Sequence, residues 1–236
     1  MRKSSWTLLI LLVGMAGLSS CGLVAGQQAA PQAQTAPTIP PAPEMASPPG
    51  EIVLQDGFAG KLSEMWAVLD AAQRPGEEAR WYTQDGILAQ GGTTRDRDSV
   101  ESAYLVVNSG ADWTDYTLQA SIYVDGNDEV GLTFRVNDQG FYRFRMRSAE
   151  FDGPFQVGLD RYQDEVYTVL WHAPGGGFPS RTWFTLQVQV QGDTFTVAVD
   201  GQTLATVQDP AFSEGGVGFY AWAEGGAYFD NVVVTR

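Results

Sequence analysis

The sequence predicts an all-β protein, a two-sheet antiparallel jelly-roll sandwich formed by residues 51–236. Three observations indicate this fold class. Apolar and polar residues alternate with a period of two through most of this region, no stretch carries the apolar stripe of a helix, and Gly-rich or Asp-Gly turns separate the alternating runs. About a dozen short strands joined by tight turns favour an antiparallel sandwich over a parallel sheet.

The N-terminus combines a basic start with an apolar run. Arg2 and Lys3 precede apolar residues 6–18, and Ser19-Ser20 leads into Cys21, the only cysteine. This order of charge, apolar length and small residues resembles the lipobox of bacterial lipoproteins. The resemblance implies that residues 1–20 are a signal peptide and that Cys21 is lipidated. An ordinary secretory signal is the alternative.

The composition excludes several cellular locations and classes of binding partner for the protein. The chain has a formal net charge of −14, which argues against nucleic acid and against docking by charge on an anionic bilayer. No further apolar segment reaches the length of a membrane span. We therefore expect an extracytoplasmic domain that meets a bacterial membrane through its lipid anchor only. A single cysteine also excludes intrachain disulfides and thiolate zinc sites.

A tether is predicted between the anchor and the domain. Residues 21–50 are dominated by Pro, Ala and Gln, with almost no charge or large apolar content. Such a segment cannot bury enough surface to offset its chain entropy, so we expect it to be disordered. Six of the seven tryptophans and all nine tyrosines lie after residue 50. The sandwich is therefore expected to begin at Glu51.

Two regions of the domain allow strands to be paired. Apolar residues at every second position from Leu186 to Val190 precede turns at residues 192–193 and 200–201, which predicts a three-stranded meander. A second hairpin is expected over residues 130–147. A two-residue loop would put its two apolar sets on opposite faces, so we predict a three-residue loop that pairs Phe134 with Phe144.

Several strand and turn motifs follow one another in a characteristic order. They are DYTL (115–118), VGLTFR (130–135), YRFR (142–145), WFTL (183–186), GGVGFYAW (215–222) and FDNV (229–232). Together they resemble the concanavalin A-like lectin/glucanase superfamily, in particular the laminin G-like jelly rolls grouped with the 3-keto-disaccharide hydrolase domain. The resemblance covers nearly all of residues 52–236. It implies two antiparallel sheets of six or seven strands, one of them concave.

A ligand-binding face is predicted from the second hairpin. The expected register places Arg135 opposite Arg143, with Arg145 on the same face, and two facing guanidinium groups need an acid or a ligand between them. Tyr220 and Trp222 alternate away from the apolar residues of their strand and are expected to add an aromatic platform for a sugar. The resemblance implies that this hairpin lies in the concave sheet. The alternative is an arginine–carboxylate ladder without a ligand.

Catalytic residues are not expected. The resemblance implies three acids in the pattern Glu-x-Asp-x-(x)-Glu on one strand of the glycoside hydrolases. Glu150 and Asp152 begin this pattern, but Pro154 and Phe155 stand where the third acid belongs. His172 is the only histidine. Glu150, Asp152 and His172 are the candidates that a hydrolase would have to use.

Calcium is the one cofactor that the sequence suggests. The resemblance implies a structural calcium site between the first and last strands, at positions matched by Asp56 and Asp230. A second acidic run, residues 125–129, has the oxygen density that calcium favours but not the spacing of a helix-loop-helix calcium loop, and such a run is more often only a hairpin turn.

These predictions combine into one functional hypothesis. We expect a membrane-anchored lipoprotein whose non-catalytic sandwich binds a carbohydrate or another cell-envelope glycan. The alternatives are a glycan-directed hydrolase of the 3-keto-disaccharide hydrolase type and a protein-interaction or adhesion module, since one fold can host all three roles.

Overall fold

A computed structural model describes residues 39–70, 79–91, 103–107, 112–151, 153–222 and 226–236. The chain divides into two units, residues 1–39 and 40–236. In the described residues of the second unit, strands are the only regular elements, and every pair of these strands is antiparallel. No helix in the described part of the chain is long and apolar enough to cross a membrane. The predicted fold class is therefore confirmed.

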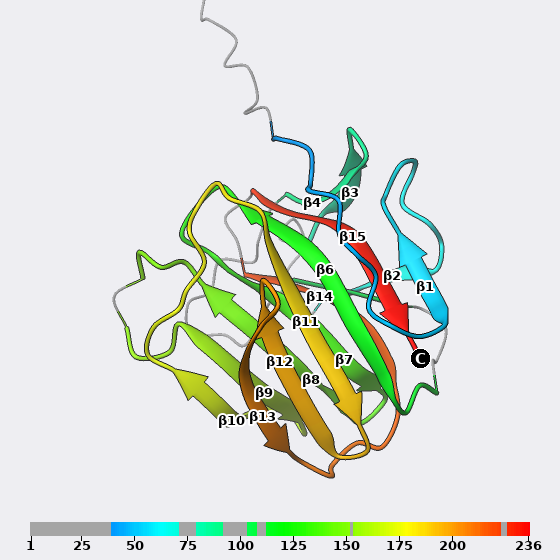
Figure 1. The fold of residues 1–236 in the computed structure, drawn as a ribbon, viewed down its shortest axis with the longest axis vertical. Helices are drawn as coiled ribbons and strands as arrows, with labels where there is room; N and C mark the ends of the chain where they lie inside the picture. The colour runs from blue at the N-terminus through cyan, green and yellow to red at the C-terminus, as the bar shows by residue number, and fades with distance from the viewer. Residues whose placement is uncertain (1–38, 71–78, 92–102, 108–111, 152, 223–225) are drawn as a thin grey trace, which may run out of the picture. The chain divides into compact units, whose positions relative to one another are not determined.

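Two sheets stack face to face (Figure 1). The eight-stranded sheet has the order β13-β12-β11-β6-β15-β4-β3, with β1 paired to β15. Its strands are β1 (Ile52–Asp56), β3 (Trp81–Gln84), β4 (Ile87–Gln90), β6 (Tyr116–Val124), β11 (Phe184–Gln191), β12 (Thr194–Val199), β13 (Gln202–Gln208) and β15 (Ala227–Thr235).

The seven-stranded sheet has the order β10-β9-β8-β7-β14-β5-β2. Its strands are β2 (Trp66–Asp70), β5 (Ala103–Val107), β7 (Glu129–Asn137), β8 (Gly140–Arg147), β9 (Val157–Gln163), β10 (Val166–Ala173) and β14 (Gly216–Trp222). The predicted meander is present as β11, β12 and β13 of the other sheet, and its pairing brings Leu186 opposite Val199.

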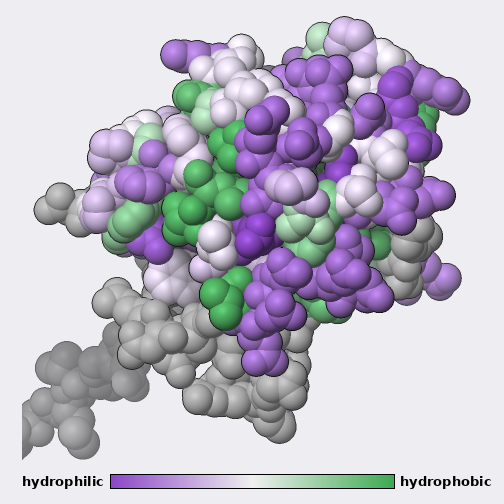
Figure 2. Space-filling model, turned by 90° about the horizontal axis from the view of Figure 1, so that it is seen from below, coloured by the Kyte–Doolittle hydropathy of each residue, from purple (hydrophilic) through white to green (hydrophobic). Residues whose placement is uncertain are grey.

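The core lies between the two sheets. Because side chains alternate along a strand, every second residue of each central strand enters this layer. Phe134 of β7 meets Phe195 of β12 with ring centroids 5.1 Å apart, and Phe219 of β14 meets Phe229 of β15 at 4.9 Å. Hydrophilic residues cover most of the surface seen from below, where hydrophobic ones gather in a limited area (Figure 2).

The register of the β7–β8 hairpin differs from the predicted one. Phe134 pairs with Tyr142, not with Phe144, and the loop has two residues between Asn137 and Gly140. The apolar sets still share one face, because a β-bulge at Arg135 adds a residue to β7 and restores the alternation. Arg135 has a φ of 52°, a backbone conformation that bulges use to turn a side chain.

Arg135 therefore leaves the predicted face. It is 1% exposed, and its guanidinium donates hydrogen bonds to the carbonyls of Phe212, Thr114 and Gly192 at 2.5, 2.6 and 2.7 Å. These carbonyls belong to loops at one end of the sandwich. Arg135 thus ties loops together, and its assignment to the binding face was wrong.

The folded unit starts earlier than the sequence indicates. Part of the expected tether, residues 40–48, lies against the outer face of the eight-stranded sheet, where Pro48 is buried. Cys21 and the signal peptide lie outside the described residues.

Candidate functional site

The candidate site is the outer face of the seven-stranded sheet, which carries polar residues in register. Thr133 of β7, Arg143 of β8 and Asp160 of β9 form one cross-strand row. In the neighbouring row Arg145 lies between two glycines, Gly131 and Gly158. A Cβ on Gly158 would lie 3.2 Å from the Arg145 guanidinium, so the glycine makes room for it.

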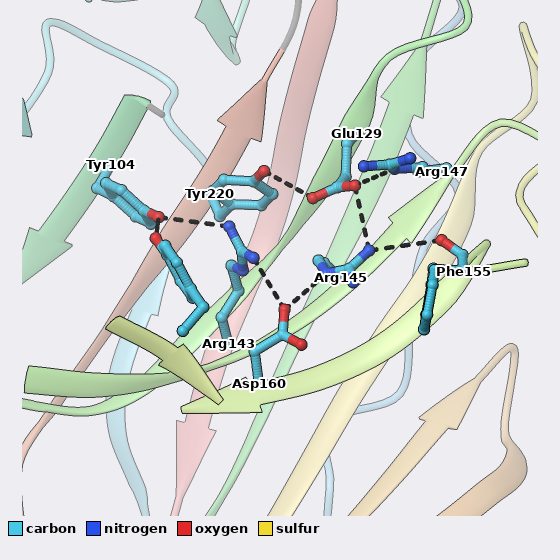
Figure 3. A network of polar contacts seen from close by, with 9 residues as sticks. Tyr104, Glu129, Arg143, Arg145, Arg147, Phe155, Asp160 and Tyr220 are labelled. Carbon is cyan, nitrogen blue, oxygen red and sulfur yellow. Dashed lines mark hydrogen bonds and ion pairs between the residues drawn. The ribbon is translucent and has the colours of Figure 1, made fainter. Parts of the chain in front are cut away.

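Two buried carboxylates hold the arginines (Figure 3). Asp160 Oδ2 accepts hydrogen bonds from Arg143 Nη2 at 2.8 Å and from Arg145 Nε at 2.6 Å. Glu129 Oε2 pairs with Arg145 Nη1 at 3.2 Å and with Arg147 Nε. All but Arg147 are less than 10% exposed. Arg143 and Arg145, two outward residues of β8, therefore share the carboxylate of Asp160. The predicted facing pair of Arg135 and Arg143 is absent, because Thr133 lies opposite Arg143.

Aromatic rings complete the network around Arg143. Its guanidinium carbon lies 4.2 Å from the ring centre of Tyr167 and 4.3 Å from that of Tyr220, so the cation is sandwiched between two π faces. Tyr220 also donates to Glu129 Oε1 at 2.7 Å. The hydroxyl groups of Tyr104 and Tyr167 are hydrogen-bonded to each other.

The Tyr104–Tyr167 contact shows that this face is concave. Tyr104 belongs to β5 and Tyr167 to β10, with four strands between them in the sheet. In a flat sheet these strands would lie about 24 Å apart, too far for two tyrosine side chains to meet. The sheet must therefore curve, as the family resemblance implied.

The charges of the network reinforce one another. Burial raises the pKa of Glu129, but the nearby charges of Arg145, Arg143 and Arg147 outweigh it and the pKa is lowered. Burial lowers the pKa of Arg145, whereas Glu129 and Asp160 raise it by more. Both groups are therefore held in their ionised forms.

Three buried polar atoms of one row lack a hydrogen-bond partner among the described residues. They are Thr133 Oγ1, Arg143 Nε and Asp160 Oδ1. Buried polar groups in proteins are nearly always satisfied, and ordered water is the usual partner where the protein supplies none. The row therefore has capacity for a further small polar partner.

An open groove adjoins the network. It is lined by Leu69 of β2, by residues 137–141 of the β7–β8 hairpin, and by residues 162–165 of the β9–β10 hairpin. Phe141 and Tyr162 stack with centroids 5.0 Å apart, and Phe141 lies 5.0 Å from Tyr104. The groove thus combines aromatic rings with amide and carboxylate side chains.

Most of the predicted binding residues meet on this face. Arg143, Arg145 and Tyr220 lie in the network. Trp222 is opposite Glu129 on the neighbouring strand β14, and it packs against the cluster that contains Tyr104, Phe141 and Tyr220. The carboxylate partners were missed. Glu129 was assigned to an acidic turn. Asp160 stands at an outward position directly after residues 157–159, and this acid could have indicated the pairing.

The weak catalytic candidates do not form a site in the described part of the chain. Glu150 is exposed in a turn after β8, where its N–H donates to Ser148 Oγ. His172 is exposed on β10, with its ring 4.5 Å from that of Phe155. Asp152 lies outside the described residues.

The two predicted calcium ligands lie near each other. Burial and the charge of Asp56 raise the pKa of Asp230, although a hydrogen bond from the Asn231 N–H lowers it. Both Asp56 oxygens already accept hydrogen bonds, from Phe58 N at 2.8 Å and from Trp66 Nε1 at 2.9 Å. Calcium takes six to eight oxygens, and the described residues contain no group of three or more metal-ligating acids, cysteines or histidines. This pair alone does not fit a calcium ion.

Acidic residues 125–129 form the β6–β7 turn. Asp125 pairs with Arg181 at 2.5 Å, and Glu129 belongs to the arginine network. Of the two interpretations of this run, the hairpin turn agrees with the structure.

The two stacked sheets and the concave polar face define a concanavalin A-like β-sandwich. The chain belongs to the family described as 3-keto-alpha-glucoside-1,2-lyase-like domain, which it matches over residues 50–235. No functionally curated protein matches the chain significantly.

Solved structures of carbohydrate-active proteins share the fold. The carbohydrate binding module CBM66 of Bacillus subtilis is 17% identical, with a TM-score of 0.57 over 74% of this chain and 99% of that one. The Bacillus licheniformis beta-glucanase is 11% identical, with a TM-score of 0.55 over 79% and 99% of the chains. An endo-β-galactosidase of Clostridium perfringens is 11% identical, with a TM-score of 0.54 over 82% and 64%. At these identities the likeness shows the fold alone.

Proposed function

We propose that the protein binds carbohydrate in the groove on the outer face of the seven-stranded sheet. The observation that carries the proposal is the lining of the groove, in which aromatic rings adjoin hydrogen-bonding side chains on a concave surface. Sugar sites combine these two elements because a pyranose has apolar CH faces and a rim of hydroxyl groups. The related fold of a carbohydrate binding module supports the same class of ligand.

The groove offers both kinds of contact. Tyr162 is half-buried against Phe141 and can present one ring face to a sugar. Asn137, Gln139 and Gln163 provide amide groups that donate and accept hydrogen bonds. The carboxylates that also line the groove accept hydrogen bonds from hydroxyl groups; they are Asp138, Asp164 and Glu165.

The arginines act indirectly in this proposal. The guanidinium groups of Arg143 and Arg145 form ion pairs with Asp160, and that of Arg145 also pairs with Glu129. These arginines therefore hold the shape of the face, and the groove residues make the direct contacts with the ligand. This differs from the sequence-based hypothesis, in which they bind the ligand.

Catalysis is the second candidate, because the family description names a lyase. A 1,2-elimination on a 3-keto-glucoside needs a base to remove the C2 proton, which the keto group acidifies, while the C1–O bond breaks and the leaving oxygen takes a proton. Glu129 is a poor base, because its pKa is lowered and it is held in ion pairs. If an enzyme activity exists, the exposed groove carboxylates Asp164 and Glu165 are the first residues to test.

The location is also a proposal. We propose that Cys21 is lipidated and that the domain works outside the cytoplasm, attached to a bacterial membrane or displayed on the cell surface. Radiolabelled or alkyne-labelled fatty acid should enter the wild-type chain in cells and be lost in Cys21→Ser. Equal labelling of the two chains would contradict lipidation.

A glycan array tests the binding proposal with the full chain. Tyr162→Ala should reduce retention on the bound glycans at least tenfold, because it removes the ring that stacks on the sugar. The matched control is Tyr82→Ala, an exposed tyrosine on the other sheet, which should leave retention unchanged. No retained glycan, or equal loss in both variants, would overturn the proposal. Mass spectrometry of the same glycans and their 3-keto forms reports cleavage, which would favour the enzyme.

A further inference from the structure

Residues 40–48, here called the strap, cross the outer face of the eight-stranded sheet (Figure 1, dark blue). Three strap carbonyls accept hydrogen bonds from side chains of this face. Pro40 O accepts from Trp183 Nε1 at 2.8 Å, and Pro43 O accepts from Asn231 Nδ2 at 3.1 Å. Ala46 O accepts from Gln119 Nε2 at 3.1 Å. The accepting residues are spaced three apart.

Burial follows the same period. Ala42 and Met45 are half-buried and Pro48 is buried, whereas the strap residues between them are exposed. Met45 contributes its sulfur, which lies 3.2 Å from Ser121 Oγ and 3.1 Å from Thr185 Oγ1. One side of the strap thus faces the sheet at every third residue.

A three-residue period is the signature of polyproline II, the helix with three residues per turn and no internal hydrogen bonds. Four of the nine strap residues are prolines, which preorganise this conformation. Its backbone carbonyls need external donors, and the sheet supplies them from Trp183 beside β11, from Gln119 of β6 and from Asn231 of β15. An aromatic ring with hydrogen-bond donors is how proteins recognise extended proline-rich peptides.

We infer that this face is a docking surface for extended proline-rich peptide, and that its occupant is the strap of this same chain. The sheet recognises the peptide through hydrogen bonds to the carbonyls at positions 40, 43 and 46 and through packing against the small or flexible side chains at 42, 45 and 48. Only residues 49–51 separate the strap from β1, so its effective concentration is roughly millimolar. A peptide of the same sequence must therefore compete with it. The surface lies on the sheet opposite to the proposed sugar groove, so the two proposals are tested separately.

The main experiment uses the full chain with Pro40, Pro41, Pro43 and Pro48 replaced by glycine, which weakens the strap and leaves the sheet unchanged. A labelled peptide of residues 38–50 should bind this variant, and half-saturation of the wild-type chain should need at least about tenfold more peptide. A peptide carrying the same four glycines should bind the variant at least fivefold more weakly. Absence of binding to a variant whose circular dichroism is unchanged, or equal binding of both peptides, would overturn the inference.

A second measurement leaves the strap sequence intact. The Trp183 ring packs 5.5 Å from that of Tyr123, and Trp183→Phe keeps an aromatic ring there but removes the N–H that reaches Pro40. Cleavage after Glu44 by a glutamate-specific protease should become several-fold faster in this variant, because proteases need an undocked segment. Tyr82→Phe is the matched control and should not change the rate. An unchanged rate in Trp183→Phe would contradict docking through this donor.

Discussion

Replacing Asp160 with asparagine tests the buried network most directly. The substitution keeps the size of the side chain and removes one of two negative charges that face Arg143, Arg145 and Arg147. Asp160 is 1% exposed and its Oδ2 accepts from two guanidinium groups. Removing one partner of a buried ion pair costs about 3–5 kcal/mol, because the remaining charges stay buried without compensation. For a domain of this size, such a loss lowers Tm by roughly 6–20 °C.

Urea unfolding of the full chain, followed by tryptophan fluorescence, measures the loss. Asp112→Asn, at an exposed position, is the matched control and should change the free energy of unfolding by less than about 0.5 kcal/mol. The double variant Asp160→Asn/Arg143→Met removes one charge of each sign and should recover part of the loss. A loss below about 1 kcal/mol in Asp160→Asn alone would show that the network does not stabilise the fold as argued.

Three further predictions concern pH, calcium and packing. The pKa of Glu129 is lowered in the folded protein, so the stabilisation from its ionised carboxylate is present above the pKa of the unfolded state and disappears as pH falls through the pKa of the folded state. Glu129→Gln should therefore lower Tm at pH 7 and make Tm fall less steeply as pH is lowered. An unchanged fall of Tm at acid pH would refute this. The pKa of Asp230 is raised, so its ionisation destabilises the fold as pH rises. Asp230→Asn should therefore raise Tm at pH 7 in chelator, whereas a calcium-dependent rise in wild-type Tm that the variant loses would instead support a calcium site shared with Asp56. Gly131→Ala would place a Cβ 2.1 Å from the Phe144 carbonyl oxygen and should cost about 1–3 kcal/mol, while Gly60→Ala, with nothing within 4 Å, should be neutral by denaturant unfolding.

The strap shows where composition misleads. Proline-rich sequence with almost no charge and few large apolar residues predicts disorder, because such a chain cannot bury enough of its own surface. Residues 40–48 are ordered by a surface that lies elsewhere in the chain, through donors at positions 119, 183 and 231. No local pattern within the strap reveals those donors, because its prolines, at positions 40, 41, 43 and 48, do not follow the three-residue period of the contacts.

The sequence by itself determined the fold class and the sides of the strands. Alternation with a period of two is a local property, so the division of Leu132, Phe134 and Phe144 from Arg143 and Arg145 could be read without coordinates. The order of the motifs likewise indicated the family over nearly the same residues that match it.

Only the tertiary structure decided what the outward residues do. A single bulge turned Arg135 from the face into the end of the sandwich, and strand order brought Glu129 and Asp160 beside the arginines. Sheet curvature then joined Tyr104 to Tyr167 across four strands. The physical reason is that strand alternation depends on neighbours two residues apart, whereas charge pairing, curvature and docking depend on residues brought together only when the chain has folded.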